Sequence, residues 1–502
     1  MRKRILSMFL VAVTSVSMLV GCGNETKQEN TKQEESKQTS VSSEVKSSEK
    51  SEESKEEPVT VTWLMAEDEP EDSDMVLEDL NKKLVEAINV KLNIVWISGG
   101  EYNDRVRLAS TSGEDYDIVF TSNWRNNFDE NMSRGAFLEI GDLIDQYGQN
   151  ILAKIHPALW DVATVKGGIY AIPNQQISAG QNAFYVQKDL AEKYNFTLTK
   201  TSTDDWRDLE PFLDEVLANE ENMYGIDIQI GPGPSIYESV ISGCYIRMDD
   251  DPSDGVEVLW HHLEGFYDMA ELKAKGYLHP EYGIGGDMKV PLQNNQFAVL
   301  SSRGYPYGEV AVSNAQGEEY ILCYKGEPYF SIEAGKDTML AINVNSKNPE
   351  AAVKLIDALW GDEKLFNELL FGLEGVHYNK VGDQRVEVIE GSNWNLWKND
   401  WAHGNQFNRW KVPGEADDIW DLVSEMNRTA KVSPLRGFSP DTSNLQAEIA
   451  QVKAVTAEYK NFNLREGWED LIEERKEKLI AAGIEVIVEE MQRQVDEFLA
   501  TK

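Results

Sequence analysis

The stretch Val59-Thr60-Val61-Thr62-Trp63-Leu64 is the first clear indication of the fold of this chain. Its β-branched residues alternate along the run, which predicts a first strand. Apolar residues at helical spacing predict a helix over 75–88, and 90–96 predicts a second strand. A short helix over 102–109 leads to a third predicted strand at 116–120. This alternation of strands and helices is typical of a parallel sheet that is covered by helices on both faces.

Ligands of such sheets bind beyond the carboxyl ends of the strands. Trp63 and Glu67 fall at the end of the first predicted strand, and Asn123 and Trp124 follow the third. Aromatic rings at such ends, surrounded by polar side chains, are typical of a ligand cleft. Core packing or a contact between lobes is the alternative for each aromatic residue. The candidate ligand-binding residues are Trp63, Glu67, Asn123, Trp124, Asn174, Tyr185, Arg303, Tyr305 and Trp394, with Gln175, Tyr307, Asn393, Trp397 and Trp401 as further candidates.

The middle of the chain predicts a second α/β lobe. Strands are expected at 224–228, 297–300 and 320–324, and a helix is expected over 258–275. The apolar run at 338–344 predicts a strand that returns to the first lobe. A chain that leaves a lobe and comes back forms a two-strand hinge, which is what closure of two lobes on a ligand requires.

Four short motifs carry a resemblance to a known family. They are GAFLEI at 135–140, GGIYAIP at 167–173, FYV at 184–186 and DWRDL at 205–209, the last with Thr203 as a candidate N-cap. In this order the chain resembles the extracellular solute-binding proteins of ABC importers, the class that includes the maltose-binding protein. The resemblance implies a two-lobe periplasmic-binding-protein type II fold. The calcium-binding loop of alginate-binding relatives would fall near 200–210, where the alternating oxygen ligands are missing, so no metal is expected.

The C-terminal part resembles one subgroup, the LipO-like solute-binding lipoproteins. The motifs are FGLEGVHY at 371–378, LIAAGI at 479–484 and MQRQVDEF at 491–498. Periodicity predicts amphipathic helices at 468–479 and 484–499. The expected fold is α/β, with two lobes, hinge strands and a mainly helical extension. The expected boundaries are 58–180 plus about 335–390 for the first lobe, about 181–334 for the second lobe and about 391–502 for the extension.

The N-terminus predicts export. Arg2, Lys3 and Arg4 precede an apolar run over 5–20, as in a secretory signal. Leu19-Val20-Gly21-Cys22 resembles a bacterial lipobox, in which the cysteine is lipidated and becomes the first mature residue; the alternative is an ordinary signal peptide with a chance cysteine. We expect a signal peptide over 1–21 and a disordered tether over 22–57, which is almost free of apolar residues.

Charge and composition exclude several classes of partner and of catalytic site. The formal net charge of −39 argues against nucleic acid and anionic lipid as partners, and weakens the case for an anionic ligand. Cys244 and Cys323 form either one disulfide or two buried thiols. No P-loop, zincin or G-x-S-x-G motif occurs, and the adjacent His261 and His262 on one predicted helix cannot face one metal together. Neither a cofactor nor a catalytic group is therefore expected.

The resemblance implies a function that fits these features. A lipid-anchored, monomeric receptor would capture an oligosaccharide between two lobes and deliver it to ABC permease subunits. It would stand on the outer face of the cell membrane, and the long tether is typical of a Gram-positive envelope. A peptide-binding receptor is the first alternative and a surface glycoside hydrolase is the second.

Overall fold

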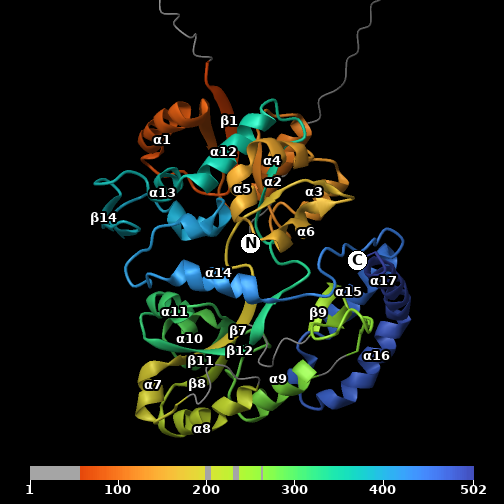
Figure 1. The fold of residues 1–502 in the computed structure, drawn as a ribbon. Coiled ribbons are helices and arrows are strands. Elements are labelled where there is room, and N and C mark those ends of the chain that lie inside the picture. Colours follow the sequence, from red (N-terminus) through yellow and green to blue (C-terminus); the bar gives the residue numbers. More distant parts are fainter. Residues whose placement is uncertain (1–56, 198–204, 230–236, 262–263, 502) are drawn as a thin grey trace, which may run out of the picture. The chain divides into compact units, whose positions relative to one another are not determined.

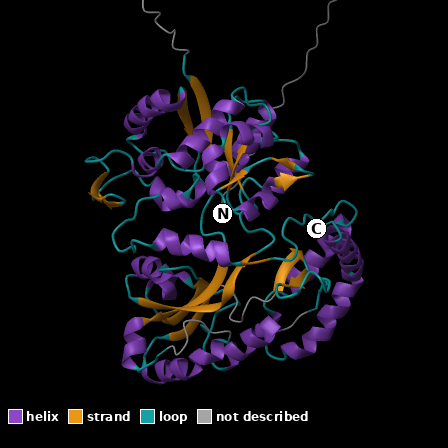
Figure 2. Cartoon of the chain, viewed as in Figure 1, coloured by secondary structure: helices purple, strands orange, loops and turns teal. Residues whose placement is uncertain are grey.

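A computed structural model describes residues 57–197, 205–229, 237–261 and 264–501 of the chain (Figure 1). The predicted signal peptide, Cys22, Thr203 and nearly all of the predicted tether lie outside the described residues. Helices and strands alternate along the described part, and they gather around two separate sheets (Figure 2).

The first sheet contains the predicted strand at 59–64. Its five strands, in spatial order, are β2 (Val90–Trp96), β1 (Val59–Met65), β3 (Ile118–Thr121), β13 (Met339–Ile342) and β6 (Ile172–Pro173). The first three are parallel, as predicted. β13 joins them in the antiparallel direction, which confirms that the chain returns to this sheet after the second lobe.

Helices cover both faces of the first sheet. Val61, Trp63 and Met65 of β1 enter one apolar core, while Leu64 enters a core on the opposite face. The first core receives Leu80 and its helical neighbours from α1, and the second receives the buried face of α2. Side chains alternate across a strand, so this division is the direct result of the β1 sequence. The helices of this lobe include α1 (Ser73–Ile88), α2 (Tyr102–Ser112), α4 (Gly141–Tyr147), α5 (Gln149–Lys154), α12 (Pro349–Gly361) and α13 (Glu363–Phe371).

The second sheet also has five strands. In spatial order they are β16 (Lys431–Val432), β12 (Tyr320–Phe330), β7 (Gly180–Gln187), β11 (Phe297–Arg303) and β8 (Tyr224–Ile228). β7 is central and pairs antiparallel with both of its neighbours. The helices here include α7 (Lys188–Lys193), α8 (Glu210–Asn219), α9 (Glu264–Ala274) and α11 (Gly308–Gln316).

The helix predicted over 258–275 is shorter than expected. Within the described residues, α9 begins at Glu264, and Leu259 instead exchanges two backbone hydrogen bonds of 2.7 Å with Tyr245. This bridge holds Val258 in an apolar core that the helical periodicity did not reveal. His261 therefore lies outside a helix, contrary to the prediction.

Asn427, in the C-terminal part, fixes the chain where it passes from the first lobe to the second. Asn427, on α14 (Ile419–Thr429), accepts hydrogen bonds from the backbone amides of Ser178 and Ala179 at 3.2 and 2.9 Å. Its amide group also donates to the carbonyl of Gln176 at 2.7 Å. Buried backbone groups must be satisfied, so Asn427 stabilises a segment that has no sheet partner there.

The region from 391 onward packs in two places. Trp394, Trp410 and Met426 join the main core of the first lobe. Residues from Leu435 to Val495 form another core with the hairpin β9 (Tyr237–Ile241) and β10 (Cys244–Arg247). The helices of this second part are α15 (Gln446–Glu458), α16 (Leu471–Ala481) and α17 (Ile484–Leu499), so the helical C-terminus is confirmed.

The remaining elements are short. They are α3 (Phe128–Ser133), η1 (Pro157–Leu159), α6 (Trp160–Ala163), β4 (Thr164–Val165), β5 (Gly168–Ile169), η2 (Trp206–Leu209), α10 (Lys289–Gln293), β14 (Tyr378–Gly382), β15 (Arg385–Val388), η3 (Leu396–Ala402), η4 (Gln406–Asn408), η5 (Phe462–Leu464) and η6 (Trp468–Asp470).

Neither cysteine of the described part belongs to a disulfide. Cys244 and Cys323 are buried in different apolar cores, which decides between the two alternatives in favour of two thiols. Among the described residues, no helix combines the length and the apolar character that crossing a bilayer requires.

Candidate functional site

A hollow of about 250 Å³ lies at the carboxyl ends of the parallel strands of the first sheet. The loops after β1 and β3 form one side of it, and the η3 segment forms the other. Its lining combines aromatic, acidic, basic and amide side chains. The lining residues are Trp63, Met65, Ala66, Glu67, Asp68, Gly99, Phe120, Trp124, Arg125, Asn399, Trp401, Ala402 and His403.

Two indole rings provide flat apolar surface in the hollow. Trp124 is 51% exposed, and its ring centroid lies 6.1 Å from that of Trp401. The indole N–H of Trp124 donates to the carbonyl of Asp337 at 2.8 Å, so the ring is fixed in orientation although it is exposed. A fixed and exposed aromatic ring is a surface on which an apolar ligand face can pack at low entropic cost.

Glu67 places a carboxylate beside these rings. Both of its oxygens accept from the side-chain amide of Asn399, at 2.9 and 3.1 Å. Nε2 of His403 lies 3.4 Å from one of the same oxygens. A carboxylate has about four acceptor sites, so Glu67 retains capacity for hydrogen bonds from a ligand.

Arg125 brings a cation to the same hollow. Its guanidinium lies 4.6 Å from the centroid of the Trp124 ring. A Cβ atom at Gly99 would stand 3.0 Å from a guanidinium nitrogen of Arg125, so the glycine leaves room for this side chain. The hollow therefore offers donors on Arg125 and acceptors on Glu67, with aromatic surface in the same lining.

Hydrogen bonds to the first sheet position the η3 segment. The carbonyl of Trp401 accepts from Asn174 at 3.2 Å and from Thr338 at 2.9 Å. The backbone amide of Gln175 donates to the carbonyl of Gly404 at 2.9 Å. Gly404 has φ +134°, where a side chain is strained and would also press on Trp360. The C-terminal segment is thus joined to the sheet directly beside the hollow.

Three of the nine candidate residues line this hollow. They are Trp63, Glu67 and Trp124, and Trp401 among the further candidates lines the hollow too. Trp63 is only 1% exposed, and its ring packs edge-on against that of His403, with the ring centroids 6.1 Å apart. Trp63 therefore supports the wall of the hollow and presents little surface to a ligand.

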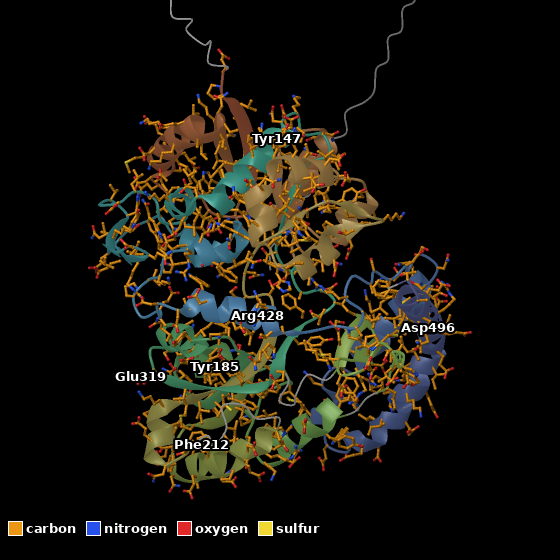
Figure 3. All side chains as sticks on the ribbon, in the orientation of Figure 1. Tyr147, Tyr185, Phe212, Glu319, Arg428 and Asp496 are labelled. Atoms are coloured by element: carbon orange, nitrogen blue, oxygen red, sulfur yellow. The ribbon has the colours of Figure 1, made fainter. Side chains whose placement is uncertain are left out.

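Burial separates Tyr185 and Trp394 from the hollow. Tyr185 is 0% exposed within the second sheet, where its hydroxyl donates to the carbonyl of Arg303 at 2.7 Å (Figure 3). Trp394 packs against Trp96, and its indole donates to the carbonyl of Leu369 at 2.9 Å. Both side chains belong to apolar cores, which corrects their interpretation as surfaces for a ligand.

The polar candidates outside the hollow form hydrogen bonds within the protein. The side-chain amide of Asn123 donates to the carboxylate of Glu333 at 2.8 Å, and that of Asn174 donates to the hydroxyl of Thr338 at 2.6 Å. The guanidinium of Arg303 donates to the carbonyl of Ile177 at 2.6 Å. Tyr305, also outside the hollow, packs against the first-lobe core. None of these four side chains is part of the lining.

The other further candidates lie outside the hollow as well. Tyr307 packs in the small core around Trp420, and Trp397 stacks on Phe371. Asn393 donates to Asp72 at 3.1 Å. Gln175 accepts from the amide of His156 at 3.1 Å.

Arg125, Asn399 and His403 line the hollow but were not among the residues predicted from the sequence. Arg125 directly follows a predicted site residue, and its position beside Trp124 was a usable signal. Asn399 and His403 flank Trp401 in a segment rich in aromatic and amide residues, but no periodic pattern placed that segment against the sheet.

A larger hollow of about 1,050 Å³ lies between the β14–β15 hairpin and the start of α13. It is lined mainly by charged residues of both signs, and its one aromatic residue, Trp410, is 5% exposed. It lacks an open aromatic face, and the smaller hollow at the strand ends is therefore the candidate ligand site.

Comparison with known proteins agrees with this architecture. Residues 77–227 match the family model of the bacterial extracellular solute-binding proteins, and residues 434–500 match a domain of unknown function, DUF3502. The chain is 26% identical over 453 residues to a carbohydrate ABC transporter substrate-binding protein of Streptococcus pneumoniae serotype 4, covering 87% of this chain and 90% of that protein. It is 23% identical over 346 residues to the polygalacturonan/rhamnogalacturonan-binding protein YtcQ of Bacillus subtilis, covering 64% of this chain and 67% of that protein.

Solved structures share the fold. The N-glycan transport solute-binding protein NgtS of Streptococcus pneumoniae superposes with a TM-score of 0.79 at 23% identity, over 88% of this chain and 99% of that chain. The alginate-binding protein AlgQ2 superposes with a TM-score of 0.57 at 18% identity, over 88% and 98% of the two chains. The predicted resemblance to extracellular solute-binding proteins and the two-lobe α/β fold are thereby confirmed.

Proposed function

We propose that this relative of the bacterial extracellular solute-binding proteins is the oligosaccharide-binding component of an ABC importer. The observation that carries the proposal is the fixed, half-exposed ring of Trp124 in one hollow with Trp401 and Glu67. The apolar faces of a sugar ring pack on indole, while its hydroxyls bond carboxylate, guanidinium and amide groups. The similarity to a carbohydrate ABC transporter substrate-binding protein supports the same function.

The proposed chemistry is binding without bond cleavage. Stacking on an aromatic ring together with charge-assisted hydrogen bonds is consistent with micromolar affinity, or about −8 kcal/mol. The second lobe would close on the ligand because contacts to the sugar stabilise the closed state. The closed, loaded protein would then deliver the sugar to the permease subunits.

The proposed location is the outer face of the cell membrane. Cys22 would carry the lipid, and the tether over 22–57 would hold the monomeric binding domain away from the bilayer. A Cys22→Ala chain is expected in the culture medium with its sugar binding intact. If that chain remains on the membrane, Cys22 is not the anchor.

Titration of the purified chain tests the function. The panel contains Man5GlcNAc, kestose, trigalacturonate and short peptides, and tryptophan fluorescence reports binding. A saturable response to at least one oligosaccharide is expected, without new reducing ends. A response to peptides alone would instead identify a peptide receptor, and new reducing ends would identify a glycoside hydrolase.

A further inference from the structure

We infer that an ion triad of Asp400, Arg409 and Glu415, the first two of them buried, positions the sugar-binding side chains of Asn399 and Trp401. The inference rests on the proposed function of the hollow. It concerns residues that do not line the hollow themselves. They would act on the ligand through the residues on either side of Asp400.

The three members of the triad contact one another closely. Nε of Arg409 pairs with a carboxylate oxygen of Asp400. Its two terminal nitrogens donate to the two oxygens of Glu415, at 3.0 and 2.6 Å. The side chains of Arg409, Asp400 and Glu415 are 5%, 7% and 19% exposed. Arg409 therefore holds two carboxylates from different parts of one segment inside the protein.

Asp400 is also held on its other side. Its second oxygen accepts from the side-chain amide of Gln406 at 2.9 Å. The carbonyl of Arg409 in turn accepts from the indole of Trp420 at 2.9 Å, and the guanidinium lies 4.8 Å from that ring. The triad is thus anchored to α14, which fixes the orientation of the guanidinium.

The backbone of η3 links Asp400 directly to Asn399 and Trp401, which line the hollow. Asn399 has φ −118° and ψ 31° inside η3, so the helical path is interrupted one residue before Asp400. This interruption allows Asn399 to reach Glu67 and Trp401 to reach Trp124, while the side chain of Asp400 between them is buried. Moving Asp400 would therefore displace two lining residues together.

Burying the carboxylate of Asp400 costs desolvation free energy. Burial raises the pKa of Asp400 above its ordinary value, and the guanidinium of Arg409 opposes that shift. Buried ion groups add little net stability compared with apolar side chains of similar volume, because desolvation offsets their attraction. Their directional hydrogen bonds do specify a single geometry. The triad is therefore better explained by a role in positioning Asn399 and Trp401 than by a contribution to the folding stability of the chain.

The test compares two variants of the full chain. Asp400→Asn keeps the shape of the side chain but removes its charge. The triple variant Asp400→Leu, Arg409→Met, Glu415→Leu replaces the triad by apolar side chains and protects the experiment against simple unfolding. Fluorine NMR of the 5-fluorotryptophan-labelled chain follows the Trp401 resonance without ligand, with assignment from Trp401→Phe. Calorimetry with Man5GlcNAc supplies the affinity.

Both variants are expected to shift or broaden the Trp401 resonance and to weaken Man5GlcNAc binding about tenfold or more, and the triple variant should keep its melting temperature. Glu368→Gln is the matched control, because Glu368 is a buried carboxylate that pairs with Lys83 away from the hollow. It should leave both the resonance and the affinity unchanged.

The outcomes separate the two proposals. An unchanged Trp401 resonance in both variants overturns the inference, whatever the ligand. A wild-type chain that binds no sugar of the wider panel overturns the proposed function, and the ligand-free resonance still decides whether the triad positions Trp401.

Discussion

The side-chain amide of Asn399 donates to both carboxylate oxygens of Glu67, across 332 positions of the sequence. Glu67 follows the first strand, whereas Asn399 belongs to the segment that returns after the second lobe. The candidate site is therefore assembled from two parts of the chain that lie far apart in the sequence. The η3 segment supplies one side of the hollow, so the strand ends do not form it alone.

The exposed ring of Trp124 should contribute directly to affinity. Trp124→Ala removes the stacking surface and is expected to weaken oligosaccharide binding about tenfold, since an aromatic contact contributes about 0.5–1.5 kcal/mol beyond the area it buries. Its melting temperature should change little, because half of the side chain is already in solvent. Calorimetric titration measures the effect.

Tyr267→Ala is the control for this substitution. Tyr267 is 50% exposed, close to the value of Trp124, and it lies outside the hollow. Equal affinity losses in the two variants would contradict a specific contribution from Trp124.

The charge of Glu67 should matter for binding. Glu67→Gln keeps the size of the side chain but removes the ionised acceptor, and hydrogen bonds to ionised groups are about twice as strong as neutral ones. We expect the Kd to rise about tenfold, or by about 1.4 kcal/mol. Glu139→Gln is a matched control, because Glu139 accepts two backbone hydrogen bonds of 3.0 and 3.1 Å in the same lobe, outside the hollow. A Glu67→Gln chain with wild-type Kd would exclude Glu67 from the site.

The two cysteines of the described part should react only after unfolding. Both thiols are buried, and burial raises the pKa of Cys244 to about 12, so little thiolate forms at neutral pH. In a Cys22→Ala chain, a thiol reagent should label no cysteine in native buffer within minutes and two in denaturant. A failure to label them in denaturant without a reductant would indicate a disulfide.

Lys325 should make stability depend on pH. It is buried beside Ser301, with Nζ 4.5 Å from the Phe184 ring centroid, and burial lowers its pKa to about 7. Between about pH 7 and 10.4 the unfolded chain binds more protons than the folded chain, so this group makes the free energy of unfolding rise with pH. Below about pH 7 Lys325 is protonated in both the folded and the unfolded chain, so the free energy of unfolding is lowered by the whole cost of burying the ammonium group.

Lys325→Met should remove this dependence. We expect it to raise the free energy of unfolding by roughly 2–4 kcal/mol near pH 6 and by less near pH 10. Urea unfolding at several pH values measures the difference, and Lys289→Met, at an exposed position, serves as the control. A Lys325→Met effect that is constant with pH would contradict the assigned burial cost.

Local sequence pattern predicted β1, β2 and β3 of the first sheet because each is a short run rich in β-branched residues, and these three strands pair in parallel. The same pattern placed Glu67 and Trp124 together, since both follow the carboxyl ends of adjacent strands. It misplaced Tyr185, because β7 is a central strand with residues 183–187 all buried, and alternation along such a strand selects no solvent face. Asn399 and His403 reach the site through long-range contacts that no local pattern encodes.

A crystal structure of the chain with a bound oligosaccharide would show whether the hollow at the strand ends holds the sugar. We expect a sugar ring in van der Waals contact with Trp124 and Trp401, with one hydroxyl within hydrogen-bond distance of Glu67. A sugar bound elsewhere, with this hollow filled only by solvent, would show that Trp124, Trp401 and Glu67 do not form the binding site.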